Sequence, residues 1–443
     1  MYRIRFTTVS SVFVILALTF VSNLSVAQNQ LFSGDTLRMD EVAKYVVTHN
    51  DRAAAMRLME KAARAKIGPA GAWDDPMLMV GVTGLPTSGS FTAEDMTMKM
   101  IGISQKIPYA GQKGLESEAA KYQADIARED TRQIELDLAS AARNAYLSLY
   151  YRQQALNFTK SQRAIQNDIV TASIKKLSTD LATQADVAAA QADLWRLDAD
   201  ILSSQQEIEA SFNELYALMG QERPAFFPAL SEPRFESIPK NLDAWLAVAW
   251  DNYPPLKRSR SQSVSYFYAA SAAQRMRWPM LELAASYGFR QTGPYDPMTG
   301  QVTKRDNMIS FQAKISLPIF SFKSQNKMAS SMNAMRLSAE AESNQAWRDT
   351  KANLQTLFSG KDRLSQSLNL YTERIIPADE DAYKSAMAGY ASNKVPFTSL
   401  YSYAMNIYRD RLAANQIAYQ LAQNMVQAGQ YILNPDELNT TDK

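Results

Sequence analysis

The sequence predicts a mainly helical chain that also carries four membrane-length β-strands, arranged as two copies of one structural unit. The stretch 111–220 has no proline and one glycine between its ends, and the residues that dominate it favour helix. Two hairpins of alternating apolar segments, 75–107 and 279–319, have strands of about ten residues, which cross a bilayer when tilted. The order helix, strand hairpin, helical hairpin occurs twice, which indicates an internal repeat.

Residues 1–27 predict a secretory signal peptide. Arg3 and Arg5 precede the apolar run 12–21, and Ser25-Val26-Ala27 offers a small-residue cleavage site. The apolar run is too short for a membrane anchor. Cleavage would remove two of the 47 basic residues and leave 45 basic against 45 acidic ones. A chain without net charge argues against nucleic acid as a partner.

The chain has no cysteine and a single histidine, His49. An exported protein without disulfides indicates a bacterial envelope protein that is stabilised by helix packing. Most nucleophilic and metal-hydrolase sites need a thiol or several histidines. We therefore expect no enzyme activity, no metal site and no cofactor, and we expect His49 at the end of a helix.

The first repeat spans 28–220. It begins with an amphipathic helix over about 34–66 and continues with the strand hairpin 75–107, whose two strands are expected over 77–83 and 96–107. A helical hairpin over 112–219 follows, with its turn near 173–181. The first arm of this hairpin would be about 100 Å long at 1.5 Å per residue. A helix of that length is typical of an elongated helical bundle and is not needed in a compact globular core.

A proline-rich linker over 221–240 separates the two repeats. The second repeat, 241–432, has a helix over 242–277, the strand hairpin 279–319 and a helical hairpin over 325–430. The second strand of this strand hairpin is expected over 308–319. Pro76 corresponds to Pro279, an offset of 203 residues. A longer second strand loop raises this offset to about 212. Residues 433–443 are expected to form a flexible tail.

Four strands per chain cannot close a barrel. An open sheet in lipid would leave backbone groups unpaired along both edges, which hydrocarbon does not tolerate. We therefore expect three protomers to share one barrel of twelve strands, a size within the range of outer-membrane barrels. The helices would continue this barrel as a long periplasmic α-helical barrel.

The sequence resembles the TolC-like outer-membrane efflux protein family over about residues 35–432. The motifs that carry the resemblance are Asp75-Pro76, Ile103–Gly111, Ala182–Val187, Ser316–Phe320 and Ala388-Gly389-Tyr390. The resemblance implies a homotrimeric duct in the outer membrane of a Gram-negative cell. It also implies a periplasmic adaptor and an inner-membrane pump as partners. Asp75-Pro76 and the proline-tyrosine join are most similar to the branch that serves heavy-metal pumps of the RND type.

The resemblance also places a gate at the two helical turns, and the second turn, 388–396, is expected to move. Tyr390 occupies the place of a family tyrosine that helps to close the periplasmic end, and Asp186 matches an aspartate of the neighbouring hairpin. Lys394 lies beside the position of a family arginine. Ser399 and Ser402 stand where the best-known member carries carboxylates, so a cation-attracting ring is not expected.

Six residues of the strands are expected to line the lumen of the barrel. They are Met96, Met98, Met100, Glu282, Ser286 and Gln312, whereas Leu283 and Phe311 should face lipid. Thioethers suit a soft ion such as Cu(I). A duct that bound its cargo tightly would not release it, so we interpret the methionines as an adaptable apolar lining.

Three functions remain open at this point. The first is the export duct of an efflux pump for small molecules or metal ions. The second is the duct of a type I protein secretion system with the same fold. The third is a periplasmic coiled-coil protein with a structural or adhesive role, against which the two strand hairpins argue.

Overall fold

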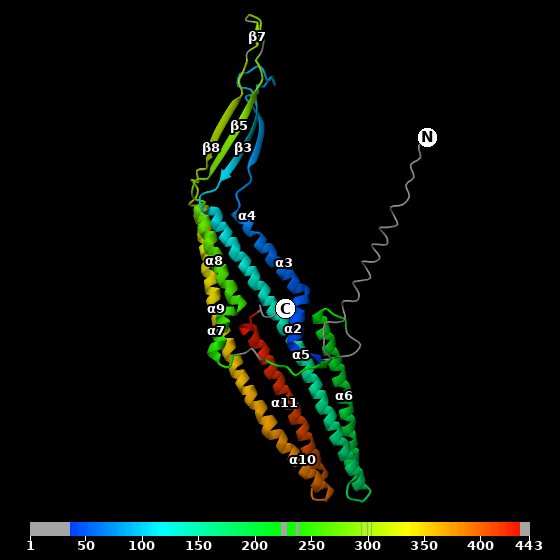
Figure 1. Ribbon diagram of the computed structural model, residues 1–443. Helices are drawn as coiled ribbons and strands as arrows, with labels where there is room; N and C mark the ends of the chain where they lie inside the picture. The colour runs from blue at the N-terminus through cyan, green and yellow to red at the C-terminus, as the bar shows by residue number, and fades with distance from the viewer. Residues whose placement is uncertain are drawn as a thin grey trace, which may run out of the picture. The chain divides into compact units, whose positions relative to one another are not determined.

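The computed structural model describes residues 36–222, 228–235, 239–293, 295–298, 300–302 and 304–434 (Figure 1). The predicted signal peptide and the tail beyond residue 434 lie outside this part of the chain. Contacts divide the chain into two compact units. Unit 1 comprises Met1–Val46, Ala141–Glu236 and Leu364–Gln423, and unit 2 comprises Val47–Ser140, Ser237–Arg363 and Asn424–Lys443. Each unit therefore contains segments of both sequence repeats.

Unit 2 contains a four-stranded antiparallel sheet with the order β2-β3-β5-β8. Its strands are β2 (Met77–Thr83), β3 (Met98–Ile107), β5 (Leu281–Arg290) and β8 (Met308–Ile315). The sequence predicted that the second strand begins at Met96 and that the fourth continues to Ile319, and both expectations were too long. Thr97 instead donates a hydrogen bond to the Gly84 carbonyl, 2.6 Å away. Pro318, which has no N–H for a ladder, lies in the turn after β8.

The two faces of this sheet differ in chemistry. The register aligns Ser104 with Ala284 and Ala284 with Gln312, and the side chains of such partners point to the same face. The polar face consists of Met77, Met79, Gly81, Thr83, Met98, Met100, Gly102, Ser104, Lys106, Glu282, Ala284, Ser286, Gly288, Arg290, Met308, Ser310, Gln312 and Lys314. The apolar face consists of Leu78, Val80, Val82, Lys99, Ile101, Ile103, Gln105, Ile107, Leu281, Leu283, Ala285, Tyr287, Phe289, Ile309, Phe311, Ala313 and Ile315.

The first helix of each repeat is divided in two. The sequence predicted one helix over 34–66 and one over 242–277. The structure has α2 (Met39–His49), α3 (Asp51–Ala65) and a short α4 (Ile67–Gly71), and then α7 (Leu242–Asn252) and α8 (Pro254–Arg275). Asn50 begins α3 because its side chain accepts from the Arg52 N–H, and Pro254 begins α8. His49 ends α2, as the sequence predicted.

Trp245 of α7 is the centre of the hydrophobic core in unit 2. It is fully buried and packs with Ala249, Leu354, Ala428 and Ile432. Its ring meets the Phe358 ring edge to face at 5.2 Å, and its Nε1–H donates to the Pro239 carbonyl at 2.6 Å. Burial of this ring joins the first helix of the second repeat to its helical hairpin.

Tyr146 has a comparable role in unit 1. It lies on α5 (Gln112–Leu177), which with α6 (Gln184–Met219) forms the first helical hairpin. A short parallel pair, β1 (Thr36–Leu37) with β4 (Ala229–Leu230), runs past it and was not predicted. The buried Tyr146 hydroxyl lies 2.8 Å from the Leu37 carbonyl oxygen and 2.7 Å from the Ser231 carbonyl oxygen.

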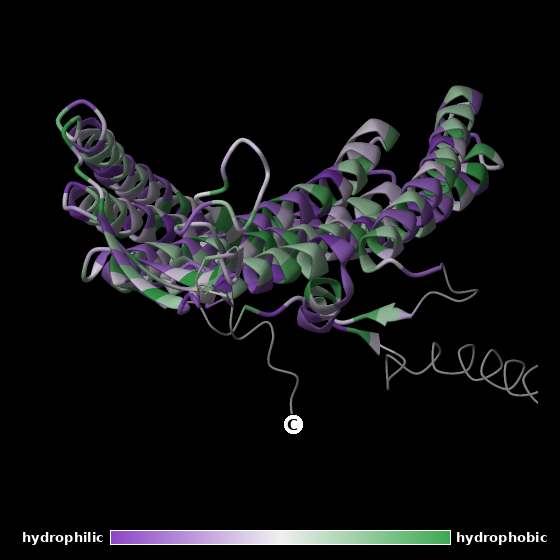
Figure 2. Cartoon of the chain, turned by 90° about the horizontal axis from the view of Figure 1, so that it is seen from above, coloured by the Kyte–Doolittle hydropathy of each residue, from purple (hydrophilic) through white to green (hydrophobic). Residues whose placement is uncertain are grey.

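The second helical hairpin is less regular than predicted. It consists of α9 (Gln325–Leu370), the π-helical turn η1 (Tyr371–Ile375), α10 (Ile376–Ala391) and α11 (Phe397–Ile432). The loop between β5 and β8 carries a small pair, β6 (Tyr295–Asp296) with β7 (Gln301–Val302). None of the described helices is long and apolar enough to cross a membrane. Hydrophilic and hydrophobic segments alternate along the helices in Figure 2.

Candidate functional site

The turns of the two helical hairpins in unit 1 have the same backbone structure. Each contains one residue in the left-handed region, Asp180 with φ 58° and Asn393 with φ 61°. Asp and Asn tolerate this conformation better than other side-chain-bearing residues. The Leu181 N–H donates to the Lys176 carbonyl at 2.8 Å, and the Lys394 N–H donates to the Gly389 carbonyl at 2.8 Å. The repeat therefore extends to the geometry of the turns.

Tyr390, at the end of α10, joins the two hairpins. Only 3% of this side chain is exposed. The hydrophobic cluster around it draws on α5, α6, α10 and α11 and contains Ile169, Val170, Ala190, Leu194, Ala386, Leu400 and Ala404. The tyrosine hydroxyl lies 3.4 Å from Ser173 Oγ on α5.

Lys176 of α5 completes the contact between the hairpins. Its ammonium lies 4.0 Å from the centroid of the Tyr390 ring, a cation–π geometry, and 2.5 Å from Asn393 Oδ1. One lysine of the first hairpin therefore holds two residues of the second. The sequence alone does not point to Lys176, because no local spacing relates Lys176 to Asn393, 217 positions away.

The three predicted gate residues, Asp186, Tyr390 and Lys394, line one pocket of about 570 Å³ at these turns. No described hydrogen bond or ion pair joins the three side chains to one another. The Asp186 carboxylate instead accepts from the N–H of Thr183 at 3.1 Å and from its hydroxyl at 2.8 Å. Thr183 accepts in return from the Asp186 N–H, so the pair forms a capping box at the start of α6.

Five of the six predicted lumen residues lie on the polar face of the sheet. Glu282 lies 3.6 Å from Lys314 across the ladder, and Ser286 and Gln312 lie on the same face. Met98 and Met100 are also there, whereas Met96 precedes β3. The two residues expected to face lipid, Leu283 and Phe311, lie on the apolar face and are exposed in the single chain.

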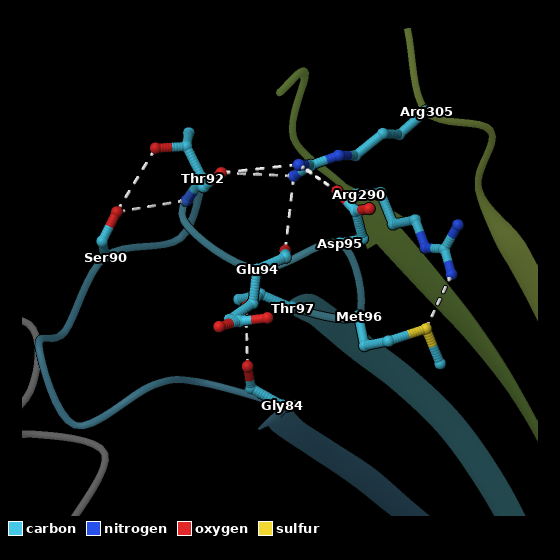
Figure 3. Close-up of polar contacts among 9 residues, drawn as sticks. All are labelled: Gly84, Ser90, Thr92, Glu94, Asp95, Met96, Thr97, Arg290 and Arg305. Atoms are coloured by element: carbon cyan, nitrogen blue, oxygen red, sulfur yellow. Dashed lines mark hydrogen bonds and ion pairs between the residues drawn. The ribbon is translucent and has the colours of Figure 1, made fainter. Parts of the chain in front are cut away.

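Three methionine sulfurs on or beside the polar face have protein partners. Arg290 Nη2 lies 2.7 Å from Met308 Sδ and 3.5 Å from Met96 Sδ, and Figure 3 shows the second of these contacts. Thr83 donates to Met100 Sδ at 3.4 Å. The guanidinium of Arg290 thus contacts two of these thioether sulfurs. Among the described residues there is no group of three His, Cys, Asp or Glu side chains that could hold a metal ion.

Arg305 joins the two strand-hairpin loops in the same region (Figure 3). Its guanidinium forms an ion pair with Asp95 and donates to the carbonyl oxygens of Thr92 and Glu94 at 3.3–3.5 Å. Only 8% of the Arg305 side chain is exposed. The loop after β2 is therefore fixed to the segment before β8, a contact that the sequence did not predict.

Comparisons with known proteins place these features in a class. Residues 48–221 match the family model described as Outer membrane efflux protein. No curated protein sequence matches the chain closely enough to count as a relative. The family match confirms the resemblance to the TolC-like outer-membrane efflux proteins and, at the level of the family, the predicted outer-membrane location. The branch within the family is not resolved.

Solved structures show that the fold extends over nearly all of the chain. The outer membrane protein VceC from Vibrio cholerae is 16% identical with a TM-score of 0.69, covering 91% of this chain and 97% of its own. The MtrE outer membrane channel of Neisseria gonorrhoeae, in its open state, is 16% identical with a TM-score of 0.68, covering 91% of each chain. CusC is 16% identical with a TM-score of 0.69, covering 93% and 96%.

Proposed function

We propose that this protein is the outer-membrane export duct of a tripartite efflux pump. The observation that carries the proposal is the sheet β2-β3-β5-β8, which has one apolar and one polar face. A strand that alternates apolar and polar residues fits the wall of a water-filled barrel, with the apolar face toward lipid. The match to an efflux family supports a duct rather than a periplasmic filament.

Three chains are needed to complete the barrel. The edges of the sheet, β2 and β8, have no further partner strand in the described chain. Edge strands in lipid must be paired, so β8 of one protomer would pair with β2 of the next. The homotrimer has a twelve-stranded barrel, and its helices form the periplasmic continuation to which an adaptor and an inner-membrane pump dock.

The contact of Lys176 with Tyr390 and Asn393 is proposed as the lock of the periplasmic gate. It joins the first hairpin to the end of the second, where closure of a duct must occur. Asp186 and Lys394 line the adjoining pocket and are proposed to act with it. A partly exposed cation–π contact contributes about 1 kcal/mol, which over three protomers shifts an opening equilibrium by about tenfold or more.

The cargo is proposed to be small molecules or metal ions. The predicted heavy-metal branch would favour a soft ion, but Arg290 beside Met96 and Met308 opposes a second cation at those sulfurs. This contact favours an organic cargo over a metal ion. The duct of a type I secretion system has the same fold and remains the second candidate.

Two measurements test this proposal. Purified protein in planar bilayers should conduct as a trimer, and Lys176→Ala should raise its conductance about tenfold. Lys175→Ala, an exposed lysine one residue away, is the matched control and should conduct like the parent. Deletion of the gene should sensitise cells to dyes, detergents or metals. Absence of both trimers and conductance would overturn the duct, and a changed secretion of a protein with unchanged sensitivity would favour the second candidate.

A further inference from the structure

The second helical hairpin is interrupted at η1, about four turns before Tyr390. In η1 the Ile376 N–H donates to the Tyr371 carbonyl, five residues back, instead of four. Pro377 follows directly and has no N–H to continue the ladder. A π turn beside a proline weakens the backbone hydrogen bonding of a helix and is a recognised cause of bending.

An additional residue accounts for η1. Leu354 and Phe358 occupy the places of Ala142 and Tyr146, at an offset of 212 residues, and three of the four are fully buried. At the turns the offset is 213, from Asp180 to Asn393. One residue has therefore been added between these points in the second repeat. The π turn lies in this interval and accommodates it.

Two carboxyl groups meet just beyond this interruption. Asp379 on α10 lies within hydrogen-bonding reach of Asp410 on α11. Two carboxyl groups can share a hydrogen bond only when one of them carries a proton. Asp379 Oδ2 is buried and has no described hydrogen-bond partner. Burial, followed by the hydrogen bond to Asp410 and its charge, raises the pKa of Asp379 to about 6.

The cations close to this pair in sequence already have partners. On α11, Arg411 donates to Glu380 at 2.6 Å and Arg409 donates to Asn406 at 3.3 Å. On α10, Lys384 forms an exposed ion pair with Asp381 at 3.4 Å.

No cation among the described residues offsets the raised pKa of Asp379, whose causes are burial and Asp410. Glu373 and Arg374 of η1 are exposed. On α5, Asp168 lies beside Tyr383 and raises the pKa of that hydroxyl, after the larger effect of burial. The Asp379–Asp410 contact therefore depends on its own proton.

We propose that η1 and Pro377 form the hinge of the second helical hairpin, and that the proton shared by Asp379 and Asp410 holds α10 against α11 beyond this hinge. Loss of the proton leaves two facing carboxylates that repel each other, so the segment that ends in Tyr390 is released. The hinge stands on the geometry of unit 1, whereas its effect on gating rests on the proposed duct.

The direction of the pH dependence follows from the raised pKa of Asp379. Its value of about 6 in the folded chain exceeds the ordinary 3.8. The contact therefore contributes its full stabilisation at pH values below the ordinary pKa of 3.8, and this stabilisation is lost as the pH rises through about 6. The hairpin is held closed at pH 5 and is loosened at pH 7.5.

Spin labels test the hinge without reference to transport. The chain has no cysteine, so Lys384→Cys and Ser402→Cys place one label on α10 and one on α11. In the purified full-length protein, the distance distribution between labels should broaden between pH 5 and pH 7.5. After correction for intrinsic exchange, the backbone amides of 376–391 should exchange about tenfold faster at pH 7.5 than at pH 5. The factor is about ten because pH 5 lies about one unit below the raised pKa of Asp379.

Asp379→Asn is the decisive variant, because its amide donates to Asp410 at every pH. Asp379→Asn should keep a narrow distribution of label distances at both pH values. Asp381→Asn, at an exposed neighbouring position, is the control and should still show the broadening at pH 7.5. A change with pH that persists in Asp379→Asn, or no change in the parent, would overturn the proton lock. Conductance is measured in parallel: a pH-dependent hinge in a protein that does not conduct would support the hinge and overturn the duct.

Discussion

The two helical hairpins share one plan but differ in how rigid they are. In the first, α5 is a single helix of 66 residues without proline. In the second, the corresponding helix is divided by η1 and Pro377. The positions of Asp379 and Asp410 are occupied in the first hairpin by Gln166, which donates to the Ala190 carbonyl at 3.0 Å, and by the buried Leu197. One copy of the repeat thus has a continuous helix, and the other carries the interruption that we propose as a hinge.

The cores of the two repeats provide the largest expected difference. Trp245 corresponds to Val42, 203 residues earlier, and both are fully buried. Trp245→Ala should lower the free energy of unfolding by about 4 kcal/mol, because a large cavity and an unpaired Pro239 carbonyl remain. Val42→Ala should cost about half as much. Thermal unfolding followed by circular dichroism measures both, and an equal loss would contradict the larger core of the second repeat.

The two faces of the sheet should differ in their response to an added charge. Leu283→Asp and Phe311→Asp place a carboxylate on the apolar face and should each cost about 2 kcal/mol per chain in lipid. Ser286→Asp and Gln312→Asp on the polar face are the controls and should be tolerated. Urea titration of folding into lipid vesicles gives the values. If both sets are tolerated equally, the assignment of the faces is wrong by one residue.

A hydroxyl distinguishes the two helical hairpins at one buried position. Tyr146 hydrogen-bonds through its hydroxyl with the Leu37 and Ser231 carbonyls, whereas Phe358 occupies the matching place in the second repeat. Tyr146→Phe should lower the unfolding free energy by about 1–2 kcal/mol, since buried acceptors lose their donor. Phe358→Tyr is the reciprocal variant and should bring no gain. If Tyr146→Phe leaves the free energy of unfolding unchanged, the hydroxyl does not hold β1 and β4 in place.

The smallest effect is expected at the first turn. Thr183→Ala removes the capping box with Asp186 and should cost about 1 kcal/mol, measured as faster amide exchange in the first turn of α6. Thr179→Ala, in the same turn but outside the box, should leave this exchange unchanged. If Thr183→Ala instead raised conductance as Lys176→Ala does, Asp186 would belong to the lock and not only to the cap.

The sequence predicted most of the elements, because their signals are local. Period-two alternation assigned the faces of the strands, and the bounds of β2 match the prediction because Pro76 and Gly84 flank it. The splits at Asn50 and Tyr253 were missed because apolar spacing continues across them. η1 was missed because its residues, Tyr371–Ile375, are ordinary helix formers.

The candidate site was harder to predict than the fold. Its expected location at the hairpin turns came from the family resemblance, whereas the contact of Lys176 with Tyr390 depends on packing between segments far apart in sequence. The Asp379–Asp410 contact was accessible in principle. The two residues are almost equally distant from the turn 392–396, and a helical hairpin places such residues opposite each other. Arg163 and Asp198, which form an ion pair, flank the first turn in the same way.

The surplus residue in η1 also sets the rotational phase of the hairpin. Each residue turns an α-helix by about 100°, so an uncompensated insertion would swing every later side chain, Tyr390 included, to another face. A π turn confines the surplus to one loop of the helix, so α9 and α10 keep the alignment that α5 has without it. Deleting one residue within η1 would therefore leave Tyr390 facing Lys176, whereas the same deletion a few residues later would turn it away.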